Sequence, residues 1–293
     1  MENTLATKAL DSVTPDVKAM VLNDRKKMGG SQFPTIPLIR LANKDMKQAP
    51  EGEYFIETRK GKDEEPDIQP IGPNPEIVVL YKTNTYSYYT PEDGLVAWTS
   101  DIHGFGPMDH VTLYRRKGDK VTIDFDGVWP AFKQHKEAKY EPIDPVTEKK
   151  KKLLKYKTVL YVLFEGKPYK MFVSNASSVG VDANGNPSFD KPQPKSLEAV
   201  MKCWWFDRRM SYEYAISLGS TLIEATKPYY IVQVLKEREL SADELDVAAP
   251  ASKDVLNAIL AMDDARLRKA LDETESPEMT PADASEVFAN EPA

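Results

Sequence analysis

Cysteine and histidine are scarce in this chain. Among its 293 residues there is one cysteine, Cys203, and there are three histidines, His103, His110 and His135. A single cysteine cannot form an internal disulfide, and these residues do not stand at the CxxC or HxxxH spacings that hold zinc. We therefore expect a protein without a disulfide framework, without a structural metal and without a cofactor.

Long apolar stretches are missing as well. No run of about 18 apolar residues occurs, which is the length that a membrane-spanning helix needs. The first 28 residues mix Asp, Glu and Lys throughout and so lack the apolar segment of a signal peptide. The sequence predicts a cytoplasmic protein with no membrane partner.

The short motifs of common enzymes are also absent, since no GxSxG, GxGxxG, Walker A or HExxH string occurs. The remaining candidates for metal or acid–base chemistry are Asp101 with His103, Asp109 with His110, and the pair Asp124 and Asp126. Asp and His pairs of this kind arise freely in turns, so a structural role is favoured. We expect a protein that is not an enzyme and has no catalytic residues.

Positively charged residues are missing from the end of the chain. The formal net charge is −7, and between Asp272 and Ala293 there are seven acids and no Lys or Arg, which leaves 39 acids against 39 bases elsewhere. A segment rich in acids, Pro, Ser and Thr cannot bury enough apolar surface to order itself. The sequence predicts a disordered acidic tail attached to an electrically neutral body.

What the sequence does contain is a long series of strand-like segments. From Phe33 onward, β-branched and aromatic residues alternate with polar ones, and turns containing Pro and Gly, such as 70–76 and 91–94, separate the runs. A period of two with short turns is typical of antiparallel strands. We predict a mainly β, α+β fold built on an antiparallel, OB-like barrel with long loop insertions.

Helical segments are expected on both sides of this core. Residues 15–28 and 196–206 have helical spacing, residues 241–244 resemble a capping box that begins a short helix, and 252–271 form a further amphipathic helix. The lysine-rich segment 133–157 contains two prolines that would interrupt a helix, so it is expected to be a long basic loop.

These patterns divide the chain into four expected parts. They are an N-terminal helical segment (1–32), a β-rich OB-like nucleic-acid-binding core (33–240), C-terminal helices (241–271) and a disordered acidic tail (272–293).

Aromatic residues on the expected strands stand next to cations. A β surface of this kind suits stacking of bases, with the cations following the phosphates, although each ring taken alone is more simply a core residue. Residues 202–209 combine two Trp with two Arg and are either a helix end docked on the barrel or a stacking patch. The full predicted set of nucleic-acid contacts is Tyr86, Tyr88, Trp98, Arg115, Arg116, Lys120, Trp129, Lys149, Lys150, Lys151, Lys152, Trp204, Trp205, Arg208 and Arg209.

A strand-rich core with basic loops precedes an acidic tail that has one aromatic residue, Phe288, near its end. From about Ile36 to Ala293 this layout resembles the OB-fold single-stranded DNA-binding proteins of tailed bacteriophages. The resemblance is one of layout, not of a motif. It implies binding of single-stranded DNA with little sequence specificity, in phage DNA replication or recombination in the host cytoplasm, and a tail that occupies the basic groove or recruits replication proteins.

Two other classes of protein stay open. One is a phage structural or interaction protein with a self-associating β core, in which exposed aromatics are interface anchors and the helices of 241–271 form an assembly arm. The other is a metal-dependent nucleic-acid enzyme that uses the dispersed Asp101, Asp124 and Asp126. A chelator separates the last class from the first reading, because nuclease chemistry requires a divalent metal and strand binding does not.

The tail generates a testable prediction. Its negative charges are expected to compete with phosphates for the same cationic groove, so removal of the residues after Leu271 should tighten binding of single strands. The gain should be largest at low salt and should shrink as the Debye length approaches roughly 8 Å near physiological ionic strength. Titration with oligo(dT) at several salt concentrations measures both. If truncation leaves the affinity unchanged at every salt concentration, the tail does not bind in the groove.

Overall fold

The computed structural model describes residues 36–43, 46, 49–58, 65–118, 120–145, 147–175, 180, 195–224 and 228–275, with the side chains of the last helix described up to residue 263. The helix expected over 15–28 lies outside the described residues. The tail beyond Glu275 and most of the loop at 176–195 lie outside them as well.

Strands make up most of the regular structure, as the sequence predicts. The strands are β1 (Leu38–Leu41), β2 (Tyr54–Thr58), β3 (Asp67–Gly72), β4 (Glu76–Thr90), β5 (Gly94–Thr99), β6 (His110–Lys117), β7 (Lys120–Val128), β8 (Lys155–Phe164), β9 (Lys167–Ser174), β10 (Tyr214–Ile223) and β11 (Tyr229–Glu239). The helices are α3 (Trp129–Tyr140), α5 (Leu197–Phe206), the short 3-10 helix η1 (Ser211–Glu213) and α6 (Ala242–Glu275).

The strands join in one open, mixed sheet. Along its main path the order is β3-β2-β1-β9-β8-β4-β5-β6-β7, and the β10–β11 hairpin attaches to β4. The path ends at β3 and β7, which do not pair with each other in the described part of the chain, so the expected barrel closure is not confirmed. The sheet is not purely antiparallel either, because β1 runs parallel to β9.

Strand β4 holds the two halves of the sheet together. One edge pairs with β8 from Val78 to Ser87. The other edge changes partner along its length: residues 76–78 pair with β10, Asn84 with Ile102, and residues 87–90 with β5. An irregularity between Val79 and Tyr81 marks the change. A strand of 15 residues can serve two half-sheets because each uses a different stretch of its edge.

The two faces of the β4–β8 pair contribute side chains to two different hydrophobic cores. The inner face carries Leu160 and Val162, which pack in a cluster with strands β1, β2, β9, β10 and β11 and with α5. The outer face carries Val159 and Tyr161, which pack against α6. The alternation follows from the period of two of a β-strand. A third cluster lies on the inner face between β5, β6, β7 and α3, with Leu113 and Phe132 fully buried.

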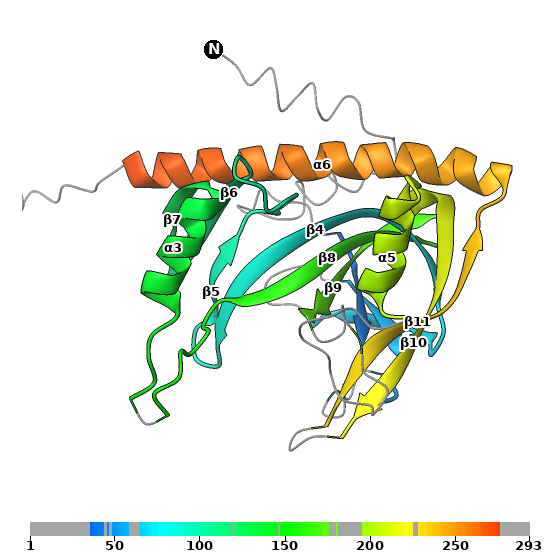
Figure 1. Ribbon diagram of the computed structural model, residues 1–293, viewed down its shortest axis with the longest axis horizontal. Helices are drawn as coiled ribbons and strands as arrows, with labels where there is room; N and C mark the ends of the chain where they lie inside the picture. Colours follow the sequence, from blue (N-terminus) through cyan, green and yellow to red (C-terminus); the bar gives the residue numbers. More distant parts are fainter. Residues whose placement is uncertain are drawn as a thin grey trace, which may run out of the picture.

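Helix α6 covers the outer face as one continuous helix, where the sequence predicts two. Figure 1 shows it running along the curved β4–β8 pair. Pro250 stands inside the helix and removes one backbone donor. Packing on both sides of the proline holds the helix together, since Ala248 and Val255 are both buried against the sheet. The helix also continues to Glu275, so residues 272–275, expected in the tail, are helical.

A buried hydrogen bond fixes α6 at the irregularity in β4. The Ser252 hydroxyl donates to the Leu80 carbonyl oxygen at 2.7 Å. Leu80 and Tyr81 both belong to the outer cluster with Val255 and Ile259 of α6. The expected assembly arm is therefore, in its described part, a helix packed on the sheet of its own chain.

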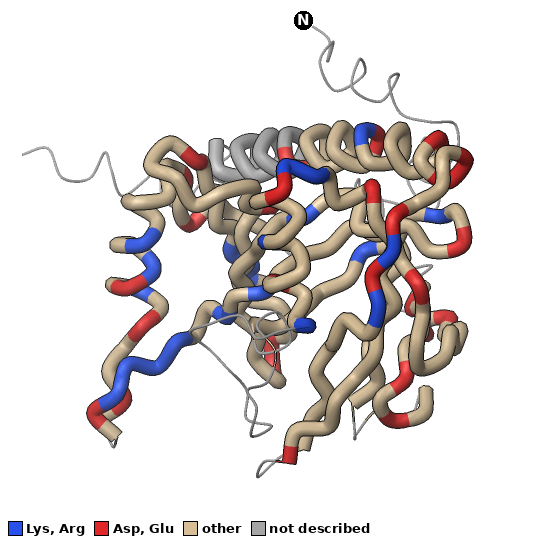
Figure 2. The backbone as a smooth tube through the Cα atoms, turned by 45° about the vertical axis from the view of Figure 1, so that its right-hand side comes forward, with Lys and Arg blue, Asp and Glu red and all other residues tan. Residues whose placement is uncertain are grey.

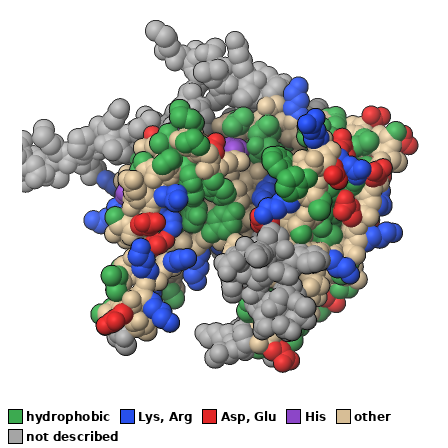
Figure 3. Space-filling model, viewed as in Figure 1, with side chains coloured by type: hydrophobic (Ala, Val, Ile, Leu, Met, Phe, Trp, Pro, Cys, Tyr) green, Lys and Arg blue, Asp and Glu red, His purple; other side chains and the backbone are tan. Residues whose placement is uncertain are grey.

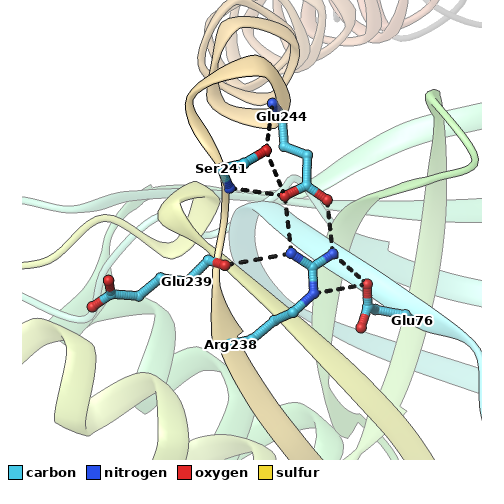
Figure 4. Close-up of polar contacts among 5 residues, drawn as sticks. All are labelled: Glu76, Arg238, Glu239, Ser241 and Glu244. Atoms are coloured by element: carbon cyan, nitrogen blue, oxygen red, sulfur yellow. Dashed lines mark hydrogen bonds and ion pairs between the residues drawn. The ribbon is translucent and has the colours of Figure 1, made fainter.

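The start of α6 is tied to two strands by Arg238, at the end of β11 (Figure 4). Its guanidinium donates to both carboxylate oxygens of Glu244 at 2.7 and 2.9 Å and to Glu76, the first residue of β4, with Nε at 3.1 Å. The Ser241 backbone amide donates to Glu244 at 2.8 Å, and the Glu244 amide donates to the Ser241 hydroxyl at 3.4 Å. The capping box predicted from the sequence is confirmed.

The Glu244 contacts predict a pH dependence of stability. Hydrogen bonds from Arg238 and from the Ser241 amide lower the pKa of Glu244 to about 2. The folded-state pKa lies below the unfolded value of about 4.3, so the ionised carboxylate stabilises the fold above that pH, and this contribution is lost as the pH falls from about 4.3 to about 2. The Tm of Glu244→Gln should be lower than that of the unchanged protein at pH 7, and the difference should shrink across this window.

Thermal unfolding followed by circular dichroism from pH 7 to pH 2 measures the difference. Glu92→Gln is the matched control, because Glu92 is an exposed carboxylate in the turn between β4 and β5. Its Tm should follow that of the unchanged protein at every pH. A Glu244→Gln difference that stays constant down to pH 2 would contradict the contribution of the carboxylate charge.

Candidate nucleic-acid interface

Helix α3 occupies part of the segment that was expected to be a basic loop. Residues 129–140 are helical, and the helix ends before Pro142. Pro130 stands in its first turn, where a proline is tolerated because the amide there has no helical partner. Phe132 and Tyr140 are buried and anchor the helix to the sheet. Of the expected loop 133–157, only residues 141–154 are a loop, because β8 begins at Lys155.

Asp124 on β7 pins α3 against the sheet. Its carboxylate accepts hydrogen bonds from His135 Nε2 at 3.0 Å, from the Tyr140 hydroxyl at 2.9 Å and from Lys139. Burial alone would raise the pKa of Asp124, but the hydrogen bonds from Lys139, His135 and Tyr140 outweigh it and hold the pKa below its usual value. The charged carboxylate of Asp124 therefore has a structural role, which is to hold α3 against β7.

Four aromatic rings meet on the inner face between α3 and the β4–β8 pair. We call Tyr86, Phe105, Trp129 and Tyr156 the aromatic cluster. Tyr86 and Tyr156 are directly opposite in the strand pairing, with ring centroids 5.4 Å apart. Trp129 stacks beside Tyr86 at 6.2 Å, and Phe105 lies 4.7 Å from Trp129 and 6.1 Å from Tyr156. Phe132 lies beneath the cluster, fully buried.

The aromatic cluster has a side that faces solvent. The side chain of Phe105 is 42% exposed, and Tyr86, Trp129 and Tyr156 are each partly exposed. Figure 3 looks onto this side of the molecule and shows hydrophobic side chains gathered in a patch that Lys and Arg side chains border. Rings in this position are within reach of a ligand, which rings in a closed core are not.

Lysines approach the aromatic cluster from α3 and from the loop that follows it. Lys136 Nζ lies 5.5 Å from the centre of the Tyr86 ring and also donates to Glu141. The pKa of Glu141 is lowered mainly by this hydrogen bond, against the effect of burial, and also by the charges of Lys152 and Lys150. These lysines of the loop therefore lie near Lys136.

The loop over 141–154 is itself folded back like a narrow hairpin. Ile143 pairs with Lys150, and the Asp144 amide donates to the Lys149 carbonyl oxygen at 2.9 Å. Lys149, Lys150, Lys151 and Lys152 are all exposed. Figure 2 shows a continuous basic run along this loop, which projects from the body beyond the end of α3. We call residues 141–154 the lysine arm.

A tyrosine and a lysine extend the site toward α5. The Tyr156 hydroxyl donates to Asn84 Oδ1. Lys82, Asn84 and Tyr86 alternate along β4 and so share the inner face. Burial lowers the pKa of Lys82. The negative charge of Glu198 on α5 opposes this shift, and the positive charge of Lys202 adds to it. Burial, Tyr156 and Glu141 together raise the pKa of Tyr86 to about 12, so its hydroxyl stays protonated near neutral pH.

The structure brings together some of the predicted contacts and separates others. Tyr88 lies in the same half of the sheet as Tyr86, edge-on to Tyr140 at 6.4 Å. Arg115 is close enough to Tyr140 to lower the pKa of its phenol, against the larger effect of burial, and it is exposed. Trp129 is itself part of the aromatic cluster, and Lys149 to Lys152 lie on the lysine arm that follows α3.

Three predicted contacts lie elsewhere. Trp98 pairs with Ser87 and Tyr114 across the outer face, and the Arg116 guanidinium lies 5.6 Å from its ring. Lys120 is at the turn between β6 and β7, opposite Lys117. Trp98 and Arg116 therefore lie on the outer face and are not part of the aromatic cluster on the inner face.

The two Trp residues of α5 have opposite environments. Trp204 is 3% exposed, stacks on Tyr214 with ring centroids 5.3 Å apart, and donates through Nε1 to Glu237. Trp205 is 73% exposed and contacts the exposed Phe206. Arg209 donates to the Tyr214 hydroxyl, and Arg208 is exposed. The helix end is therefore both a core contact and an exposed patch, each through a different Trp.

Sequence reasoning did not assign Phe105, Lys136 or Tyr156 to the site. Phe105 lies in the irregular segment between β5 and β6, and Tyr156 reaches the site through its register opposite Tyr86. Neither position has a local signal. The buried position of Trp204 did have one, because Leu197, Val200, Met201 and Trp204 follow helical spacing and all pack in the inner core.

The three aspartates proposed for metal chemistry do not converge. Asp101 accepts hydrogen bonds from the Thr83 and Tyr161 hydroxyls at 2.9 and 2.7 Å. Asp126 accepts from Thr112 at 2.7 Å, while Asp124 binds α3. Among the residues that the structure describes, there is no group of three or more His, Cys, Asp and Glu side chains that could hold a metal ion.

Comparison of the chain with protein-family models, with curated proteins and with solved structures gives no match. Within the described part of the chain, no helix combines the length and the apolar character needed to cross a membrane.

Proposed function

We propose that this protein binds single-stranded DNA with little sequence specificity, as a factor in phage DNA replication or recombination. The observation that carries the proposal is the solvent-facing side of the aromatic cluster, where the exposed ring of Phe105 lies against Trp129 and Tyr156. Bases of any sequence can stack on such rings, because every base has a π-face.

The lysine arm supports the same function. Four consecutive exposed lysines, Lys149 to Lys152, lead away from the aromatic cluster, and Lys136 stands between the arm and Tyr86. A nucleic-acid strand requires rings for its bases and a track of cations for its phosphates. In this proposal Arg115, Lys136 and the lysine arm pair with phosphates, and Tyr86, Phe105, Trp129 and Tyr156 receive bases.

The β4–β8 pair supplies the binding face. We propose that it acts as the corresponding face of an OB-like barrel does, with the sheet left partly open. The acidic tail would then compete for the groove or recruit replication proteins. Trp204 is excluded from the contacts by its burial, and Trp98 and Arg116 are not part of the aromatic cluster because they lie on the outer face.

A self-associating interaction protein is a second candidate, which one observation favours. Trp205, Phe206 and Met210 form an apolar group at the end of α5, with exposed fractions of 73%, 72% and 55%. Exposed apolar patches of adjoining aromatic residues mark protein–protein contacts. The two candidates differ in one observable, because self-association raises the mass in solution with protein concentration when no nucleic acid is present.

Substitution of Phe105 tests the stacking surface. Phe105→Leu should weaken binding of oligo(dT) about fivefold or more, because base stacking on an aromatic ring contributes roughly 1–3 kcal/mol. Quenching of intrinsic Trp fluorescence, with Trp129 in the site, measures the affinity. Tyr89→Leu is the matched control, since Tyr89 is 69% exposed but lies at the turn end of β4. Equal affinities of the two variants for oligo(dT), or no binding by the unchanged protein, would contradict the proposal.

Substitution of the lysine arm tests the phosphate track. Lys149 to Lys152 replaced by Gln should weaken binding to all sequences alike and should reduce the magnitude of the slope of log K against log[salt] by up to about 3, since each phosphate contact on a single strand contributes about 0.7. The same four positions replaced by Arg keep the charge and should keep the slope. Because these side chains are exposed, thermal unfolding should be unchanged. An unchanged slope in the Gln variant would show that the arm does not contact the strand.

A further inference from the structure

A second group of aromatic and cationic side chains lies on the outer face, beyond the part that α6 covers. It shares strand β8 with the aromatic cluster and adds β9. Tyr156 points to the inner face, so its neighbours Lys155 and Lys157 point to the outer face. On β9, Lys170 pairs with Tyr161 and Phe172 pairs with Val159, which places both on the outer face as well.

Phe172 is the centre of this group. Its side chain is 45% exposed, although it stands in the middle of β9 with β8 on one side and β1 next to β9 on the other. Lys170 Nζ lies 5.1 Å from the centre of its ring and Lys157 Nζ lies 5.8 Å from it. The ring is thus open to solvent and held between two ammonium groups.

Cations from three neighbouring strands converge around the ring. Burial lowers the pKa of Lys157, and the positive charges of Lys155 and Arg40 lower it further, so both lie close to Lys157. Arg40 is paired with Glu57, and Lys170 lies 3.9 Å from Asp101. In the described segments, neither Lys155 nor Lys157 forms an ion pair with a carboxylate. We call Phe172, Lys155 and Lys157 the Phe172 patch.

The Phe172 patch matches one class of ligand. A partly dehydrated lysine with cations as neighbours favours an anion in contact with it, because the anion relieves both the lost hydration and the repulsion. An open aromatic ring beside it favours a planar ring that can stack. A base and its phosphate combine these two properties, and a carboxylate or a free phosphate ion has only one of them.

We propose that the Phe172 patch is a second nucleotide-binding subsite for the same single strand, with a base on Phe172 and its phosphate at Lys155 and Lys157. The inference rests on the proposed function. Strand β8 begins at Lys155 and β9 ends at Ser174, opposite Lys157, so both strands end beside the patch. A strand bound on the aromatic cluster near Tyr156 reaches the outer face by passing this end, and only a strand of sufficient length can occupy both sites.

Oligonucleotides of two lengths test the subsite. An OB-type surface accepts roughly 4–16 nucleotides, so oligo(dT) of about 6 nucleotides is near the lower end of this range and oligo(dT) of about 20 nucleotides exceeds it. The double variant Phe172→Leu, Lys157→Gln should bind the short oligonucleotide as the unchanged protein does and should bind the long one about fivefold or more weakly. The matched control is Lys167→Gln, because Lys167 is an exposed lysine that lies on β9, the strand of Phe172, but outside the patch.

The single variant Lys157→Gln keeps the test decisive if the double variant unfolds. It should reduce the magnitude of the salt slope by about 0.7 for the long oligonucleotide and leave the slope for the short one unchanged. Circular dichroism and thermal unfolding establish that each variant is folded.

The outcomes separate the two proposals. If Phe105→Leu weakens binding but the Phe172 patch variants bind both lengths normally, the subsite is wrong and the proposed function stands. If the patch variants weaken the short oligonucleotide as much as the long one, the patch is not a separate subsite. If the unchanged protein binds neither the short nor the long oligonucleotide, both the proposed function and the proposed subsite are wrong.

Discussion

The length of β4 is the constraint on which the rest of the structure depends. Its 15 residues pair with β8 along one edge and, in succession, with β10, Ile102 and β5 along the other. Both half-sheets therefore take their position from one strand. The irregularity at Leu80 lets the edge change partners, and the hydrogen bond from Ser252 satisfies the carbonyl oxygen at that point.

The same strand pair decides which side chains can act together. Because a β-strand turns successive residues to opposite faces, Tyr86 and Tyr156 meet on the inner face while Lys157 points away from them. Helix α3 adds Trp129 and Lys136 on the inner face because its buried Phe132 and Tyr140 and the hydrogen bonds to Asp124 hold it there. The aromatic cluster is therefore assembled from β4, β8, α3 and the segment before β6, and no single stretch of sequence contains it.

Local patterns in the sequence predict the local elements well. Alternating residues predict the strands, helical spacing predicts α5, and the Ser241–Glu244 pair predicts the start of α6. Features that depend on distant partners are not predicted. Sheet closure depends on whether the edge strands meet, the continuity of α6 through Pro250 depends on packing against the sheet, and the place of Phe105 depends on a loop conformation. Trp98 lies apart from Tyr86 for the same reason, since a period of two does not say which face of the sheet a helix covers.

The Ser252–Leu80 hydrogen bond joins residues 172 positions apart, and the apolar residues of α6 around it also pack on strand residues that are distant in the sequence. During synthesis on the ribosome, β4 and β8 emerge long before the helix that covers them, because chains grow from the N-terminus at about 5–20 residues per second. The nascent chain therefore carries Leu80, Val159 and Tyr161 uncovered for several seconds. Contacts of such high sequence separation also slow folding. A chain that stops before α6 would therefore leave these apolar side chains of the sheet without the helix that covers them.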